Sequence, residues 1–184
     1  MTGNLREKFE EKMIFEVNGK SPNIAKDVFL ASGAKIIGDV RISEGSSVWY
    51  NSVLRGDINY IQIGKFSNIQ DLCTLHLTKK SPLIIGDYVT VGHNAVLHAC
   101  TIKNNVLIGM NAIVLDDSII EENVLIAAGS VITPNSHILS GKLVAGVPAK
   151  IIRDLSDDEI TFIHQSALNY YQYALDFKST LKEK

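Results

Sequence analysis

The sequence predicts an all-β fold, a parallel β-helix, followed by one α-helix at the C-terminal end. The first observation is an aliphatic residue at every sixth position over most of the chain. The second is a small or β-branched residue four positions after nearly every aliphatic. The third is a C-terminal segment whose apolar residues recur at helical spacing. The first two observations together are typical of a hexapeptide repeat.

Three segments are expected along the chain. Residues 1–12 are charged and show no apolar pattern, so we expect a flexible N-terminal lead. Residues 13–153 are expected to form the β-helix domain, which begins with a short alternating strand at 14–17 and a turn at Asn18-Gly19. Residues 154–184 are expected to contain the C-terminal helix.

The repeat itself starts near Ile36. Each unit reads as one strand with a tight corner, and three strands make a triangular coil of about 18 residues. Successive coils are spaced at about 4.8 Å, so the aliphatic side chains stack inward along the axis. Known hexapeptide proteins have left-handed coils, and we take a left-handed β-helix from that resemblance. The usual crossover rule alone would predict the opposite hand. The inward positions are Ile36, Ile42, Val48, Leu54, Ile63, Ile69, Leu75, Ile85, Val91, Leu97, Ile102, Ile108, Val114, Ile120, Ile126 and Ile132.

The repeat ends near Gly146, and a helix is expected from about Asp157 to Leu181. The segment from Ser156 to Glu159 is a capping box, with acidic residues at the start of the helix. This helix should fold back along the prism and pack on one of its faces. Its apolar positions are Ile160, Ile163, Ala167, Tyr170, Tyr171, Ala174 and Phe177.

Composition excludes several classes of protein. The chain has 184 residues, 46% of them hydrophobic, which is enough for one domain with a real core. A net charge of −2 argues against nucleic-acid binding. We find neither an apolar run long enough to span a membrane nor a signal peptide. Cys73 and Cys100 make no disulfide framework, so a cytoplasmic location is the expectation.

Three histidines can be placed by the repeat. His76 and His98 each follow an inward aliphatic residue and are 22 residues apart, which is one coil plus a short insertion. Their imidazoles should therefore stack on one face, one coil apart. Arg55 joins the same column one coil earlier if the extra residues at 59–61 form a small bulge. By contrast, His137 and His164 have no such register and are interpreted as structural.

His93 lies on the preceding face of the coil that carries His98. Five residues of strand at about 3.3 Å each, less what the corner removes, span roughly 15 Å, so one chain should not bring His93 to the stacked pair. A three-fold homotrimer would supply His93 from a neighbouring subunit and create three interfacial sites. Gln70 follows Ile69 on the same face as His93 and should reach the site from the neighbour's side.

Three imidazoles and one water are a typical ligand set of a catalytic zinc ion. The three histidines therefore predict a Zn²⁺ site, with Fe²⁺ or Co²⁺ as alternatives. The metal would lower the pKa of its water to about 7 and supply hydroxide as a nucleophile. Gln70 could orient that hydroxide. Arg55 and Asp57 would pair behind the ligands or at the subunit interface, where a plain salt bridge is the alternative. Cys100 could approach the metal, with core packing as its alternative.

These residues resemble the γ-class carbonic anhydrase family, and within it a short-loop subgroup. The resemblance covers residues 13 to about 178 and implies His76 and His98 as ligands from one subunit and His93 as a ligand from the next. The segments that carry it are Val48–Asp57, Ser67–Asp71, Thr74–His76, Gly92–His98 and Gly146–Lys150.

The resemblance also implies supporting residues around the metal. Arg55, Asn68 and Gln70 are expected in the catalytic centre, and Asp57 and Asp71 at the interface or behind the ligands. A tyrosine of the C-terminal helix should line the site. Our choice is Tyr170, with Tyr171 and Tyr173 as alternatives.

The implied activity is reversible hydration of CO2 to bicarbonate by metal-bound hydroxide at trimer interfaces. The best-studied active member of the family has glutamates where this chain has Ile58 and Lys79, and a long acidic loop that is missing here. Because those carboxylates carry protons, low activity is expected. Two alternatives remain open, since fold does not carry function: a hexapeptide acyltransferase or CoA-thioester hydrolase, and a non-catalytic, metal-stabilised scaffold subunit.

Overall fold

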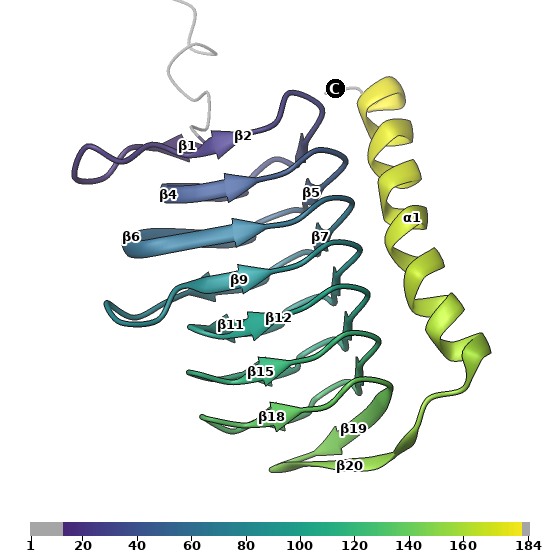
Figure 1. The fold of residues 1–184 in the computed structure, drawn as a ribbon. Coiled ribbons are helices and arrows are strands. Elements are labelled where there is room, and N and C mark those ends of the chain that lie inside the picture. Colours follow the sequence, from purple (N-terminus) through teal and green to yellow (C-terminus); the bar gives the residue numbers. More distant parts are fainter. Residues whose placement is uncertain (1–12, 182–184) are drawn as a thin grey trace, which may run out of the picture.

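The computed structural model describes residues 13–181, and the predicted lead at residues 1–12 lies outside this range. The chain forms the predicted left-handed parallel β-helix of about seven turns, with one C-terminal helix (Figure 1). Over residues 13–181, no helix combines the length and apolar character that a membrane crossing requires.

Two long strands at the N-terminal end join two faces of the prism into one sheet. These are β4 (Lys35–Ile42) and β6 (Val53–Ile63), which pair in parallel, and the short strands β1 (Ile14–Phe15) and β2 (Asn23–Ile24) pair with β4. One face, called here the histidine face, continues from β6 through β8 (Thr74–His76), β11 (Val96–His98), β14 (Ile113–Val114) and β17 (Val131–Ile132). The second face continues from β6 through β9 (Leu83–Ile85), β12 (Thr101–Ile102), β15 (Ile119–Ile120) and β18 (His137–Ile138).

The third face is a separate sheet and lies under the helix, so we call it the helix face. Its strands run parallel except for the last pair, which is antiparallel. They are β3 (Phe29–Leu30), β5 (Ser47–Val48), β7 (Asn68–Ile69), β10 (Thr90–Val91), β13 (Leu107–Ile108), β16 (Leu125–Ile126), β19 (Lys142–Gly146) and β20 (Ala149–Asp154).

The core is the stack of inward aliphatic residues that the repeat predicted. All sixteen predicted positions are buried, none more than 3% exposed. On the histidine face, Leu54 pairs with Leu75, which pairs with Leu97. Cys73 and Cys100 are free and belong to this core, and burial raises the pKa of each thiol to about 12. Core packing is therefore the role of Cys100.

The corners between strands use the left-handed backbone conformation, which Asn and Asp tolerate better than most residues. Five such corners recur at six-residue spacing or a multiple of it, with φ between 55° and 60°. They are Asn105, Asn111, Asp117, Asn123 and Asn135.

The predicted bulge before the second coil is present in β6. The pairing of β4 with β6 jumps from Gly38–Gly56 to Val40–Ile61, so extra residues of β6 loop out of the ladder. Asn59 in this loop donates to the carbonyl oxygens of Thr78 and Lys79 at 3.1 and 3.2 Å. The bulge therefore keeps Arg55 in register with the coil below.

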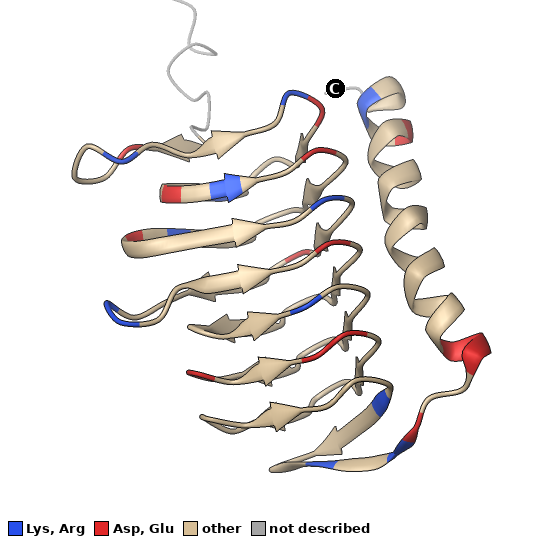
Figure 2. Cartoon of the chain, in the orientation of Figure 1, with Lys and Arg blue, Asp and Glu red and all other residues tan. Residues whose placement is uncertain are grey.

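Helix α1 (Asp157–Thr180) runs back along the prism over the helix face (Figure 1). The predicted capping box is confirmed, because Ser156 accepts from the Glu159 N–H and Glu159 accepts from the Ser156 N–H. Figure 2 shows the acidic residues at the start of α1 and a lysine near its other end. The underside of α1 packs on Trp49, whose ring centroid lies 5.5 Å from that of Tyr170.

Candidate metal centre

His76 and His98 lie side by side on the histidine face, as the repeat predicts. They are paired neighbours on β8 and β11, which are adjacent parallel strands. Nδ1 of His76 is 3.1 Å from Nε2 of His98, and the ring centroids are 5.2 Å apart. Both side chains are partly buried, which holds the two rings in place without closing them off from solvent.

Each of these two rings has a carboxylate on its outer nitrogen. Nε2 of His76 is 3.0 Å from Asp57 Oδ1, and Nδ1 of His98 contacts Asp116 Oδ1. Arg55 donates to the other oxygen of Asp57, so the predicted Arg55–Asp57 pair is formed within one chain. Burial raises the pKa of Asp57, but hydrogen bonds from His76 and Arg55 outweigh burial and lower that pKa overall.

If both rings are neutral and each outer nitrogen carries the hydrogen, the two facing inner nitrogens have no hydrogen to donate. An ionised carboxylate can only accept, so the outer nitrogen of each neutral ring carries the hydrogen. The inner nitrogens, Nδ1 of His76 and Nε2 of His98, then present lone pairs across 3.1 Å. That contact is repulsive unless a proton or a metal cation lies between them.

A divalent metal fits this pair. Zinc–nitrogen bonds of about 2.0–2.1 Å at a tetrahedral angle hold two ligand nitrogens roughly 3.3 Å apart. The observed 3.1 Å between the inner nitrogens is close to that separation. His76 and His98 are therefore suited to be two neighbouring ligands of one ion, with further ligands still to be supplied.

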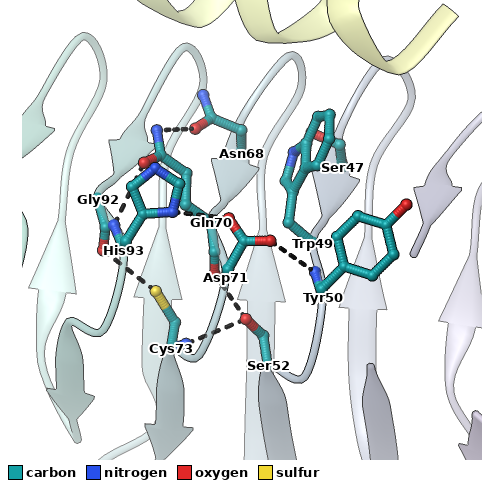
Figure 3. A network of polar contacts seen from close by, with 10 residues as sticks. All are labelled: Ser47, Trp49, Tyr50, Ser52, Asn68, Gln70, Asp71, Cys73, Gly92 and His93. Carbon is teal, nitrogen blue, oxygen red and sulfur yellow. Dashed lines mark hydrogen bonds and ion pairs between the residues drawn. The ribbon is translucent and has the colours of Figure 1, made fainter. Parts of the chain in front are cut away.

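His93 lies elsewhere in the same chain, at the corner between β10 and β11. Its Nδ1 is 2.6 Å from Asp71 Oδ2, and its ring is 38% exposed. Figure 3 shows His93 above Asp71, beside Gln70. Within residues 13–181, no three His, Cys, Asp or Glu side chains come together as a metal-binding group. One chain alone therefore does not bring the three histidines together.

Gln70 is buried and fixed at both ends of its amide group (Figure 3). Its Oε1 accepts from the His93 N–H at 3.2 Å, and its Nε2 donates to Asn68 Oδ1 at 3.2 Å. Asn68 in turn donates to Thr90 at 3.0 Å. The structure thus places Gln70, Asn68, Asp71 and His93 in one network, separate from the His76–His98 pair.

An uncharged cavity of about 380 Å³ lies between the helix face and α1. Leu107, Met110 and Leu125 give it apolar walls, and Gln70 and Tyr170 border it with polar groups. Tyr170 is the predicted tyrosine, and burial together with the nearby charge of Asp71 raises its pKa.

The two alternative tyrosines of α1 are placed differently from Tyr170. Tyr171 packs on Phe66 with ring centroids 5.2 Å apart, and Tyr173 is 49% exposed. Of the three tyrosines, only Tyr170 borders the cavity.

Asp116 contacts the histidine pair, and the sequence reasoning missed it. It stands 18 residues after His98, one coil further on, and its side chain reaches back to the His98 ring. An acidic residue one coil beyond a candidate ligand was the available signal. The six-residue period predicts which positions point into the core. It does not predict which side chains at the corners point back towards the preceding coil.

Fold and site together define a class, the hexapeptide-repeat β-solenoids that carry a histidine pair braced by carboxylates. The model for bacterial transferase hexapeptide (six repeats) matches residues 99–134. The carbonic anhydrase of Geobacillus kaustophilus is 43% identical over 172 residues, covering 94% of each chain. The chain belongs to the gamma carbonic anhydrase family.

Two further relatives show how far the likeness extends. Gamma carbonic anhydrase 2, mitochondrial, from Arabidopsis thaliana is 46% identical over 169 residues, which is 89% of this chain. This chain spans only 61% of that longer protein. Among solved structures, a hexapeptide transferase family protein from Anaplasma phagocytophilum superposes with a TM-score of 0.87 at 41% identity, covering 90% of this chain and 98% of the other.

Proposed function

We propose that the protein catalyses the reversible hydration of CO2 to bicarbonate at a metal site shared between subunits of a homotrimer. The single observation that carries the proposal is the His76–His98 pair, whose facing inner nitrogens, 3.1 Å apart, call for a cation between them. Relatives named carbonic anhydrase support the choice of substrate.

The third ligand in this proposal is His93 of a neighbouring subunit. Asp71 holds Nδ1 of His93 at 2.6 Å, which leaves Nε2 as the nitrogen for a metal. The exposed ring is available to a second chain, and Gln70 fixes the backbone that carries it. Zinc is our first choice of metal, and iron or cobalt would suit the same three imidazoles.

When bound, the metal supplies a water that ionises near neutral pH. The chain's own residues hold the histidine ligands in place. Asp57, itself paired with Arg55, holds the His76 ring, and Asp71 holds the His93 ring. Gln70 and Tyr170 contribute polar groups at the uncharged cavity, whose apolar walls suit CO2 better than a charged product.

Proton transfer is the slow step of the proposed reaction. Ile58, at the β6 bulge, and Lys79, in the following loop, occupy the positions where glutamates were expected. The bulge contacts the backbone of Lys79 through Asn59, so both positions lie beside one another. We therefore propose slow turnover, limited by proton transfer to buffer.

The test pairs three measurements on anaerobically purified protein: elemental analysis, mass in solution, and the rate of CO2 hydration. We expect one divalent metal per chain, a trimer, and a hydration rate above that of buffer which a chelator abolishes. A metal-loaded trimer whose rate equals that of buffer would refute the activity.

Acyl transfer is the second candidate, and the apolar cavity favours it. Its volume of about 380 Å³ is far larger than CO2 needs and suits the acyl group of a thioester. Hexapeptide acyltransferases use a histidine as base without a metal. Transfer or hydrolysis of an acyl-CoA that survives chelation would support this candidate over CO2 hydration.

A further inference from the structure

We infer that Asp116 is a positioning residue that keeps the His76–His98 pair open to a metal. It does so by holding the ring hydrogen of His98 on Nδ1. This inference rests on the proposed metal site, and it concerns a contact in the described chain, between Asp116 Oδ1 and His98 Nδ1.

The backbone around Asp116 ties it to the coil that carries His98. The next residue, Asp117, donates its N–H to the carbonyl oxygen of Ala99 at 2.9 Å, and Ala99 directly follows His98. The carbonyl oxygen of Asp116 accepts from the N–H of Asn135 in the coil beyond, also at 2.9 Å. The backbone around Asp116 is thus hydrogen-bonded to the coils on both sides, and its carboxylate contacts His98 from there.

Without Asp116, the two rings could satisfy one another. His98 could move its hydrogen to Nε2 and donate it to Nδ1 of His76, which is already 3.1 Å away. That neutral hydrogen bond would occupy the space between the inner nitrogens and consume the lone pairs that a metal needs. Asp116 excludes this state, because a carboxylate beside Nδ1 strongly favours a hydrogen on that nitrogen.

The other two candidate ligands, His76 and His93, also contact one carboxylate each, as His98 contacts Asp116. Asp57 contacts His76, and Asp71 contacts His93. Asp57 is itself held by Arg55. Each candidate ligand therefore has one acidic partner of its own, and Asp116 completes the set for His98.

The first test reads the tautomer of His98 directly in metal-free protein. Nitrogen NMR of the histidine rings at about pH 8, above the ordinary histidine pKa of about 6.5, should show the Nδ1–H form of His98 in the wild type. Asp116→Ala should shift His98 towards the Nε2–H form. Asp117→Asn is the matched control, because it alters the adjacent carboxylate, which accepts from Ser81, and Asn tolerates its backbone conformation.

The second test measures zinc affinity by competition with a chelating indicator. We expect Asp116→Ala to weaken binding by about 10- to 100-fold and Asp117→Asn to leave it within about twofold of wild type. Asp116→Asn keeps the size of the side chain and should give an intermediate loss. It replaces the alanine variant if thermal unfolding shows that variant to be misfolded.

The outcomes separate this inference from the proposed function. Unchanged tautomer and unchanged zinc affinity in the Asp116 variant would overturn the role of Asp116 while leaving the metal site intact. If the wild type itself fails to bind zinc, iron or cobalt, the proposed function fails. The tautomer of His98 in the metal-free proteins still decides whether Asp116 sets it.

Discussion

The polar side chains of the histidine face form a chain of contacts, in which each side chain orients the next. Asp57 touches Arg55 on one side and His76 on the other, so its ionised form is stabilised by two donors. The order of contacts runs from Arg55 through Asp57, His76 and His98 to Asp116 across successive coils. A change at any member should therefore alter the orientation of its neighbours.

Ile58 is the residue at which a single substitution should increase turnover. It is 44% exposed at the β6 bulge and directly follows Asp57. Ile58→Glu would place a proton carrier near the pair, and we expect CO2 hydration to rise by about tenfold, less than a well-positioned acid–base group contributes. Stopped-flow hydration assays over a range of buffer concentrations measure this.

Ile58→Gln is the control for that substitution, because it has similar size and cannot titrate. Equal rates for the glutamate and glutamine variants would show that the bulge does not carry protons. A rate gain at low buffer concentration in the glutamate variant alone would support proton transfer from this position.

At the scale of elements, strand-to-strand spacing leaves no room for side chains at certain glycines. A Cβ built on Gly109 would lie 2.4 Å from the backbone nitrogen of Ala128 in the next coil. A Cβ on Gly92 would likewise lie 2.7 Å from the backbone nitrogen of Met110. These glycines border the cavity, so close approach of the coils also shapes its floor.

Gly109→Ala should therefore destabilise the β-helix by about 1–3 kcal/mol, because the clash is with backbone that cannot rotate away. Chemical denaturation of the purified variant measures the loss. Ser140→Ala, on an exposed corner, is the control and should change stability by less than about 0.5 kcal/mol. Equal stability of both variants would contradict the close approach at Gly109.

The start of α1 is stabilised by a carboxylate with two kinds of partner. Glu159 accepts from the Ser156 N–H at 2.9 Å and pairs with Arg153 at 2.7 Å. Arg153, followed by the Ser156 backbone, lowers the pKa of Glu159 to about 2. A lowered pKa in the folded state means that the charged form stabilises the fold.

The stabilisation by Glu159 should accordingly depend on pH. It is fully present above the ordinary glutamate pKa of about 4.3 and is lost as pH falls towards about 2. Glu159→Gln keeps a capping group but not the charge, so it should be less stable than wild type at neutral pH. The difference should shrink as pH falls towards 2 and vanish below that pH.

Thermal unfolding of both proteins between these limits, followed by circular dichroism, checks this. Glu122→Gln, which alters an exposed carboxylate that accepts from Asn104, controls for general loss of charge. A constant difference between wild type and Glu159→Gln across the whole range would contradict the ion pair with Arg153.

For the whole molecule, assembly and metal binding should depend on the same residue. His93→Ala removes the ligand that one subunit offers its neighbour while leaving the His76–His98 pair intact. We expect metal content to fall from one ion per chain towards none, and the trimer to weaken. Elemental analysis and sedimentation measure the two effects on one sample.

His137→Ala is the matched control, because this exposed histidine pairs with Glu121 away from the site. It should keep both its metal and its mass in solution. Wild-type metal content in the His93 variant would show that the ion is held within one chain, against the shared site.

The regular part of the molecule could be predicted because its pattern is local and repeated. All sixteen aliphatic positions predicted by the six-residue spacing are buried, and the Ser156 capping box located the start of α1. The contact between His76 and His98 followed from register alone. Such features depend on backbone geometry, which the period fixes.

Other features depend on side-chain directions or on irregular chain, which a period does not encode. Asp116 turns back towards His98 from a corner, and no inward position marks it. Strand β20 reverses after Gly146 to pair antiparallel with β19, where the sequence showed only the end of the repeat. The cavity beneath α1 depends on how far the helix stands from the coils.

The position of the histidine pair along the solenoid has a consequence for durability. Each coil contacts only the coils beside it, so such a protein is expected to fray from its ends inward. β8 and β11 are central strands, with β6 and β4 on one side and β14 and β17 on the other. Amide hydrogen exchange should be slowest at these inner coils, and partial opening of a terminal coil should leave the paired imidazoles undisturbed.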